Sequence, residues 1–539
     1  MFRKHPAFIP LLLAVTLVAG LLLGNLLNRK SQPEYRPMRT ASANKLSTIL
    51  ELVQQAYVDS VDTREIIEST IPEMLENLDP HSTYIPARDM QGVEEEMQGN
   101  FSGIGVQFSI QEDTVVVIEV LSGGPSQKLG LMAGDRIVMV NDSTIAGVGI
   151  QNEQVLKLLR GQKGTKVKVS NLRRGYSEMF DFEITRGDIP IYSVDVTYMI
   201  DQETGFIKIS RFAEQTYREF MEGMAHLDSA GAKKVIIDLR SNPGGYLTAV
   251  IRMVDELLAK DEPILITRGK SQPEKVYNSS GRNSFANMKV FVLIDEFSAS
   301  ASEIFAGALQ DNDRGIVIGR RSFGKGLVQE QVPFTDGSAV RLTVARYYTP
   351  SGRSIQKPYN NGNEKYNEDI FERMVHGEFL DQDSIRFADS LKYYTRSGRV
   401  VYGGGGIMPD IFVPADTSGR SEYFNKVAQR GLVYQYAFQY TDQYRDQLKR
   451  FITVSEMEKW LDRQNLMDGF VKYAAGKGVP ANQGGLRVSG QIIETQLKAY
   501  IARNILGEEG FYPIIQQIDK TLLKAIEVSR QNLLVENLK

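Results

Sequence analysis

The stretch Val290–Gln329 reads VFVLIDEFSASASEIFAGALQDNDRGIVIGRRSFGKGLVQ and decides the fold of the central domain. Its apolar run Val290–Ile294 predicts a buried strand, Ser302–Gln310 predicts a helix, and Gly315–Ile318 predicts a second strand. Alternating strands and helices favour a layered α/β domain that carries its functional loops at the strand ends. We therefore expect functional residues in the two polar loops of this stretch.

Ser300 stands at the junction of the first strand and the helix. Ser300 and Glu303 have the spacing of a capping box, so helix capping alone is a sufficient reason for a serine here. A serine at a helix N-terminus also lies among free N–H groups and at the positive end of the helix dipole, which could stabilise an alkoxide and a tetrahedral oxyanion. Both interpretations stay open at this point.

Lys325 lies between Gly324 and Gly326, an unusual setting for a solvated surface lysine. Flanking glycines permit a constrained backbone and a close approach of neighbouring groups. A lysine that loses water can have a lowered pKa and serve as the general base of a serine nucleophile. Gln329 could hold the amine in line through a hydrogen bond. We therefore predict that Ser300 is a nucleophile and Lys325 its base.

The lysine loop has a second interpretation, because residues 319–325 fit the phosphate-binding pattern G-x-x-x-x-G-K. Two departures weigh against nucleotide hydrolysis. Gly326 occupies the position of the Mg²⁺-binding Ser or Thr, and the acidic strand precedes the loop, where it would normally follow.

The composition limits the number of domains, the partners and the catalytic groups that can be expected. With 539 residues the chain exceeds one hydrophobic core, so roughly three or four domains are expected. A net charge of -3 gives no reason to expect nucleic acid as a partner. The chain has no cysteine, and none of its four histidines, at positions 5, 81, 226 and 376, adjoins a serine in a nucleophile-like context. We expect a histidine-free base, no metal and no cofactor.

The N-terminal part predicts a membrane attachment. Ala7–Leu27 carries no charge and is flanked by basic residues on both sides, which favours an uncleaved signal anchor over a cleaved signal peptide. With a single span, the bulk of the chain is expected to be exported. Asn44–Asn77 then shows helical spacing, and this module could pair with a copy of itself or pack against the chain's own domains.

From Asn100 the pattern changes to short strands separated by glycine turns, and this region resembles a PDZ domain. The loop Gly103, Ile104, Gly105 and Val106 stands where PDZ domains carry their carboxylate-binding turn, and LGLMAGDRIVMVND is similar to their central signature. Glycines let consecutive N–H groups point at one anion, and the adjacent strand edge can pair with an extended peptide. The resemblance implies that this loop binds peptide C-termini.

Five motifs follow in order behind this region: DLRSNPGG, FSASASEIFAGALQD, SFGKGLVQ, TPSGRSIQ and GGGIMPDI. Together with the PDZ-like region they resemble the carboxyl-terminal processing peptidases, also called tail-specific proteases, over roughly residues 40–415. The resemblance implies that Ser300 is the nucleophile, Lys325 the general base and Gln329 the residue that orients the lysine. It also implies oxyanion donors from the backbone N–H groups of Ala301 and of Gly244 or Gly245.

The predicted fold class is multidomain α/β. Its parts are a signal anchor (1–29), an N-terminal helical module (30–97), a PDZ domain (98–186), a layered α/β protease core (187–415) and a helical C-terminal region (416–539). Within the core, the polar segment 357–399 is expected to be an insertion or a flexible loop. In the C-terminal region, Ser421–Tyr436 is expected to form one helix, and the region offers no recognisable chemistry.

The resemblance implies a serine endopeptidase of the bacterial inner membrane, with its bulk facing the periplasm, that recognises substrate C-termini and cleaves upstream with a Ser-Lys dyad. It allows a homodimer or higher oligomer and an adaptor protein as further partners. The alternative is an inactive PDZ scaffold or adaptor that only binds peptides. Retention of Ser300, Lys325 and Gln329 argues against that alternative.

Overall fold

The computed structural model describes residues 16–20, 45–121, 123–360, 362–386 and 388–531. The predicted signal anchor Ala7–Leu27 lies outside these residues apart from 16–20. Among the described residues, the structure contains no helix with the length and apolar character needed to cross a membrane. The chain divides into two compact units, one formed by 1–90 and 330–342, the other by 91–329 and 343–539.

The first unit contains the helices α2 (Lys45–Ala56) and α3 (Thr63–Glu76). Asp62 caps α3, because its carboxylate accepts the backbone N–H of Arg64 at 2.8 Å. The short strand β1 (Thr83–Ile85) pairs antiparallel with residues 339–341 of β18 (Ala339–Tyr348). The two alternatives for this module, pairing with a second copy and packing against the chain's own domains, both stay predictions.

Helix α4 (Ala87–Gln98) spans the boundary between the two units and is followed, in the second unit, by a small antiparallel β-domain. Its elements are β2 (Asn100–Gly103), β3 (Val106–Gln111), β4 (Thr114–Val120), α5 (Pro125–Lys128), β5 (Arg136–Val140), β6 (Ser143–Thr144), α6 (Asn152–Leu159), β7 (Lys166–Leu172), β8 (Met179–Thr185) and β9 (Gly187–Pro190). The main sheet has the order β3-β4-β5-β7-β8, so β3 forms one of its edges. Alternate residues of the strands, such as Val115 and Val117 of β4, form the core together with α6.

The central domain is built on a six-stranded sheet of order β10-β11-β12-β15-β16-β21. Its strands are β10 (Val194–Met199), β11 (Thr204–Ile209), β12 (Lys234–Asp238), β15 (Lys289–Ile294), β16 (Gly315–Gly319) and β21 (Ile411–Phe412). From β11 to β21 all neighbours are parallel. The predicted strand, helix, strand order of 290–319 is confirmed, with β15 and β16 as parallel neighbours.

Both faces of this sheet are buried, which explains its uninterrupted apolar strands. Helices α7 (Thr216–Ser229), α8 (Leu247–Asp255) and α9 (Ala301–Asp311) pack with Val290 and Val292 on one face. Phe291 points to the other face, where α18 (Lys520–Arg530) contributes Leu522. The C-terminal helix therefore completes the core of the central domain, although it lies far from that domain in the sequence.

Several strands and a helix outside the main sheet complete the domain. They are β13 (Pro263–Gly269), β14 (Lys275–Asn278), β17 (Leu327–Pro333), β18, α10 (Asn363–Val375), β19 (Lys392–Tyr394) and β20 (Val400–Tyr402). The flexible-loop alternative for 357–399 is wrong for 363–375 and 392–394, which form α10 and β19, and the insertion alternative stays a prediction. The polar sequence of this segment forms α10 and a strand of the β19–β20 hairpin because its charged side chains are paired, as with Lys357 and Asp369.

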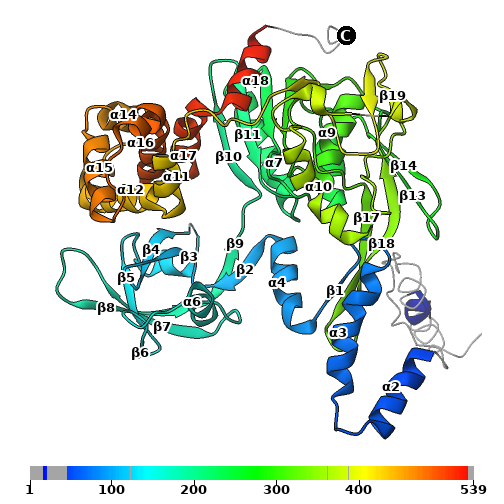
Figure 1. The fold of residues 1–539 in the computed structure, drawn as a ribbon, viewed down its shortest axis with the longest axis horizontal. Helices are drawn as coiled ribbons and strands as arrows, with labels where there is room; N and C mark the ends of the chain where they lie inside the picture. The colour runs from blue at the N-terminus through cyan, green and yellow to red at the C-terminus, as the bar shows by residue number, and fades with distance from the viewer. Residues whose placement is uncertain (1–15, 21–44, 122, 361, 387, 532–539) are drawn as a thin grey trace, which may run out of the picture. The chain divides into compact units, whose positions relative to one another are not determined.

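The C-terminal region gathers its helices into one bundle, shown in orange in Figure 1. The helices are α11 (Glu422–Gln429), α12 (Leu432–Gln443), α13 (Arg445–Leu448), α14 (Val454–Leu461), α15 (Leu466–Gly476), α16 (Gln483–Leu506) and α17 (Glu508–Ile515). The prediction of a single helix over Ser421–Tyr436 is wrong. Gly431 adopts the left-handed conformation (φ 63°) and separates α11 from α12.

Candidate active site

Three loops leave the carboxyl ends of neighbouring parallel strands: 239–245 after β12, 295–300 after β15 and 320–326 after β16. Parallel strands bring such loops to one edge of the sheet, where ligands bind in open α/β sheets. Ser300 ends the second loop with φ 55° and ψ -112°, a conformation that costs a residue with a side chain about 1–3 kcal/mol. The fold holds this serine in a strained turn at the start of α9.

The side chain of Glu303 joins the serine loop to the lysine loop. One carboxylate oxygen accepts the backbone N–H groups of Ser300 and Lys325, each at 2.8 Å. The other oxygen accepts the N–H of Gly324 at 2.7 Å and the hydroxyl of Ser322 at 2.5 Å. Burial raises the pKa of Glu303 to about 7, and the four hydrogen bonds oppose that rise. The predicted capping box of Ser300 and Glu303 is therefore present, and its glutamate also organises the second loop.

Tyr347 of β18 provides a second link between the two loops. Its buried hydroxyl donates to the backbone carbonyl of Ser300 at 3.0 Å and is also hydrogen bonded to the carbonyl of Lys325. Burial raises the pKa of this phenol well above its usual value, so Tyr347 stays protonated and keeps its donor. The two residues of the predicted pair are thus held by a common carboxylate and a common hydroxyl.

The Lys325 side chain donates to Oε1 of Gln329 at 2.9 Å. The flanking glycines are needed for close packing: a Cβ at Gly324 would lie 3.1 Å from the Cβ of Lys357, and one at Gly326 would lie 3.0 Å from the N of Gln356. The N–H groups of Gly324 and Lys325 are bound to Glu303. Because a phosphate-binding loop needs such N–H groups for its ligand, the nucleotide alternative loses its physical basis.

The loop after β12 lies directly against Ser300, the predicted nucleophile. A Cβ at Gly244 would meet the Cβ of Ser300 at 2.8 Å and the N of Ala301 at 2.9 Å. The N–H of Gly244 is bound to Oδ1 of Asn242 at 2.9 Å, so of the two predicted glycine donors, Gly244 is already engaged within its own loop. Gly245 and Ala301 offer the backbone N–H groups that the resemblance assigns to the oxyanion.

Helix α10 holds the lysine loop from the opposite side. Arg373 donates to the carbonyls of Arg321 and Ser322, at 2.7 and 3.1 Å. The ammonium of Lys357 lies 4.1 Å from the ring centre of Phe323 and is paired with Asp369 of α10. Burial lowers the pKa of Lys357, an effect that the Asp369 carboxylate opposes. Part of the polar segment that looked flexible thus supports the loop of Lys325.

The predicted peptide-binding loop lies between β2 and β3. Gly105 has φ 78°, and a Cβ there would lie 2.9 Å from Ile189. Ser126 of α5 is bound to the carbonyl of Ile104 through its N–H and its hydroxyl, which orients the loop. Beside β3 runs a cavity of about 480 Å³ lined by Phe108, Ile110 and Ile150, among other residues. A groove next to a sheet edge, lined by both apolar and polar side chains, suits an extended peptide.

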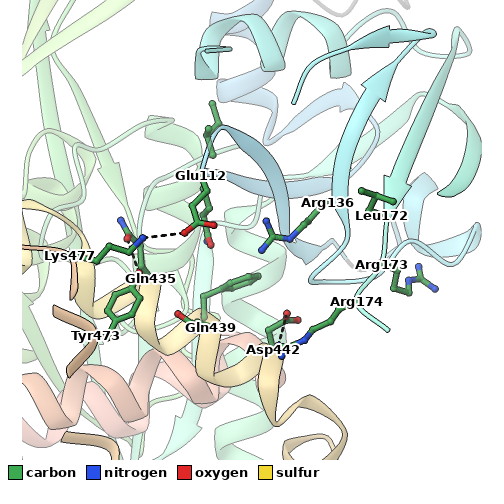
Figure 2. A pocket seen from close by; sticks show the side chains of 13 residues that line it. Glu112, Arg136, Leu172, Arg173, Arg174, Gln435, Gln439, Asp442, Tyr473 and Lys477 are labelled. Atoms are coloured by element: carbon green, nitrogen blue, oxygen red, sulfur yellow. Dashed lines mark hydrogen bonds and ion pairs between the residues drawn. The ribbon is translucent and has the colours of Figure 1, made fainter. Parts of the chain in front are cut away.

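A different cavity, of about 600 Å³, separates this β-domain from the helical bundle (Figure 2). Two ion pairs cross it, Lys477 with Glu112 at 3.2 Å and Arg174 with Asp442 at 3.4 Å. Its lining is polar and does not include Ser300 or Lys325. These contacts join the β-domain to the bundle, and the cavity is separate from the candidate active site.

Two contributors were missed in the sequence. The spacing from Ser300 to Glu303 predicted the bond to the serine N–H, but nothing local showed that the same carboxylate would also bind the lysine loop. Tyr347 lies on an ordinary-looking strand, and its sequence context carries no signal of its role.

Three segments of the chain match known protein families. Residues 203–363 match peptidase family S41, and residues 102–184 match the PDZ domain. Residues 423–507, which form most of the helical bundle, match a family of unknown function.

Similar proteins carry names of one kind. The chain is 36% identical to the carboxy-terminal-processing protease of Bartonella bacilliformis over 58% of this chain and 72% of that protein. It is 34% identical to the carboxy-terminal processing protease CtpB of Bacillus subtilis over 59% of this chain and 66% of that protein, just under two thirds of its length. Among solved structures, a photosystem II D1 C-terminal processing protease is similar at 26% identity and a TM-score of 0.33, covering 57% of this chain and 89% of that one.

Proposed function

Because this chain belongs to peptidase family S41, among the carboxy-terminal processing proteases, we propose that it is a serine endopeptidase that binds substrate C-termini through its PDZ domain and cleaves upstream. The free carboxylate of the substrate is bound by the N–H groups of the loop 103–106. The preceding residues pair with the edge of β3, beside the groove that Phe108, Ile110 and Ile150 help to line.

The proposed chemistry uses a Ser-Lys dyad. Neutral Lys325 takes the proton of the Ser300 hydroxyl while the oxygen attacks the peptide carbonyl, and Gln329 orients the amine. The N–H groups of Gly245 and Ala301 stabilise the oxyanion. When the tetrahedral intermediate collapses, the lysine delivers the proton to the leaving amine, and water then releases the acyl group from Ser300.

One observation carries this proposal: the single Glu303 carboxylate that binds the backbone of both Ser300 and Lys325. The buried Glu303 carboxylate fixes the backbone of a strained serine relative to that of a glycine-flanked lysine. Peptide binding alone does not require this arrangement. The inactive-scaffold alternative therefore has less support.

Turnover of an unfolded protein substrate tests the dyad. The Ser300→Ala and Lys325→Ala variants are expected to lose cleavage, whereas Lys365→Ala on α10 serves as a matched lysine control and should keep it. Undiminished cleavage by either dyad variant would reject the mechanism. Amidation of the substrate C-terminus should raise KM, because it removes the carboxylate that the PDZ loop binds.

We also propose that Ala7–Leu27 anchors the enzyme in the bacterial inner membrane with its bulk on the periplasmic side. The support is the uncharged, basic-flanked sequence of this segment. The full chain should stay with membranes after alkaline carbonate extraction, and a chain that begins at residue 30 should be released. Release of both chains would contradict the anchor.

A further inference from the structure

A cluster of four charged groups lies behind the candidate oxyanion loop. Arg240 follows β12 and directly precedes residues 241–245, which carry the oxyanion glycines. Its guanidinium binds Asp238 of the same strand, with Nε at 3.0 Å and Nη2 at 2.6 Å from the two carboxylate oxygens. Lys208 of β11 also pairs with Asp238, at 3.3 Å, and donates to the backbone carbonyl of Arg240.

The fourth charge comes from the C-terminal end of the chain. Asp519 accepts Nη1 of Arg240 at 2.9 Å and Nη2 at 2.6 Å, so the two side chains form a bidentate pair. The same carboxylate caps α18 by accepting the N–H groups of Thr521 and Leu522, at 3.0 and 3.1 Å. Bidentate Arg–carboxylate pairs fix geometry as well as charge.

The surroundings make this pair a defined structural feature. The side chains of Arg240 and Asp519 are only 18% and 21% exposed. Residues just before Asp519 are also attached to β10, because Tyr512 donates to Asp195 at 3.0 Å and Tyr198 is hydrogen bonded to Gln516. Asp519 lies outside all three family matches, so nothing in those comparisons assigns it a role.

The charges in the cluster balance. Lys208 and Arg240 face Asp238 and Asp519, two cations and two carboxylates in a mostly buried setting. Without Asp519, both cations would share Asp238 alone, and the guanidinium would lose its side-chain contact with the helix on the second face of the sheet. A partly buried cation that loses a partner moves toward water. Arg240 directly precedes Ser241, so a movement of Arg240 acts on the start of the loop 241–245. The backbone of Ser241 is itself left-handed, with φ 58°.

We propose that Asp519 is a positioning residue for the candidate oxyanion loop, acting through Arg240. The C-terminal segment is then part of the catalytic apparatus as well as a cover for the sheet. This inference rests on the proposed peptidase function.

The test compares variants that keep the helix cap. Asp519→Asn retains the capping oxygen but places an amide donor against the guanidinium, and Asp519→Ser retains a good N-cap without the charge. Both are expected to lower kcat about tenfold and to leave KM within twofold, since the PDZ loop and Ser300 are untouched. Asp416→Asn is the matched control. Asp416 pairs at 2.8 Å with Lys520, which lies on α18, the helix that Asp519 caps. The substitution removes this carboxylate and should keep kcat within twofold.

Two further measurements separate positioning from general destabilisation. The double variant Arg240→Gln with Asp519→Asn should have the same kcat as Arg240→Gln alone, because the aspartate acts only through the arginine. Hydrogen exchange should become faster at Ser241 and Gly244, whose N–H groups are bound to Asp295 and Asn242.

A kcat within twofold of wild type in both Asp519 variants overturns the inference and leaves the proposed peptidase function standing. If the wild-type chain proves to have no peptidase activity, the proposed function fails by itself. The exchange experiment then decides the structural claim, and unchanged exchange at Ser241 and Gly244 refutes it.

Discussion

Replacement of Glu303 by glutamine is the most informative perturbation of the candidate site. The carboxylate accepts four donors, two on each oxygen, and glutamine replaces one acceptor oxygen by a donor group. In the glutamine orientation that costs less free energy, the amide nitrogen faces Gly324 and Ser322. The serine hydroxyl can rotate, but the N–H of Gly324 is left without an acceptor. An unsatisfied buried donor costs about 1–3 kcal/mol, and the remaining bonds lose their charge assistance, so we expect a loss of about 3 kcal/mol in stability.

The catalytic effect should exceed what this loss of stability explains. The backbone of Ser300 and that of Lys325 share one oxygen of Glu303, so a shift of this side chain changes the distance between nucleophile and base. We expect kcat to fall at least tenfold at a temperature where the variant is fully folded, with KM changed less than twofold. The assay is cleavage of an unfolded protein substrate, with folding followed by circular dichroism.

Glu256→Gln provides the matched control. Glu256 is equally buried and accepts the hydroxyls of Tyr217 and Ser284, at 2.6 and 2.5 Å. Its substitution should lower the thermal midpoint to a similar degree and leave kcat within twofold. A Glu303→Gln enzyme with wild-type kcat below its unfolding temperature would refute the reasoning.

The same side chain predicts a pH dependence. Only the ionised carboxylate can accept all four donors, and its pKa is about 7, so activity should rise with pH through that value. Glu303→Gln should lose this part of the pH profile. The sign for stability is opposite: the native pKa lies above the ordinary value of 4.5, so the native state binds more protons between about pH 4.5 and 7. The contribution of Glu303 to stability therefore falls as pH rises through that window, which denaturation at pH 5 and pH 8 can measure in both forms.

Three further substitutions test other parts of the site. Tyr347→Phe removes the hydroxyl that donates to the carbonyl of Ser300, so it should cost about 1–3 kcal/mol and lower kcat, as seen by thermal unfolding and turnover; unchanged values would contradict the proposed link. Gly244→Ala should abolish cleavage, because the residue has φ 104° and its Cβ would lie 2.8 Å from that of Ser300; an active variant would exclude the tight loop. Arg353→Met breaks a fully buried ion pair with Asp311. It should lower the free energy of unfolding, measured by chemical denaturation, by about 3–5 kcal/mol. A loss below about 1 kcal/mol would show that the unpaired Asp311 carboxylate becomes hydrated.

Much of the architecture could be predicted from local patterns. The apolar runs at 290–294 and 315–318, with a helix between them, predicted two strands of a layered α/β domain, and the structure forms β15 and β16 there as parallel neighbours. The glycines around Lys325 predicted a close approach of other groups, and Gly326 indeed packs against Gln356. These features are local because strand and helix periods, and the space a glycine leaves, are properties of consecutive residues.

Local patterns failed where a partner lies far away in the sequence. The segment 357–399 suggested an insertion or a flexible loop because it is polar and charged, but Lys357 and Arg373 are buried and Arg373 binds the lysine loop. Ser421–Tyr436 was predicted as one helix, but the backbone turns left-handed at Gly431 and divides it.

By itself, the sequence determined which residues could do chemistry: a serine at a helix start, a lysine between glycines, and a glycine turn after an apolar strand. Only the tertiary structure decided how they are held, through Glu303 with four donors, Tyr347 between two carbonyls, and Arg240 bound to an aspartate 279 positions away. The physical reason is that a hydrogen bond between distant segments depends on how strands are ordered and helices packed, and it leaves no period in the sequence.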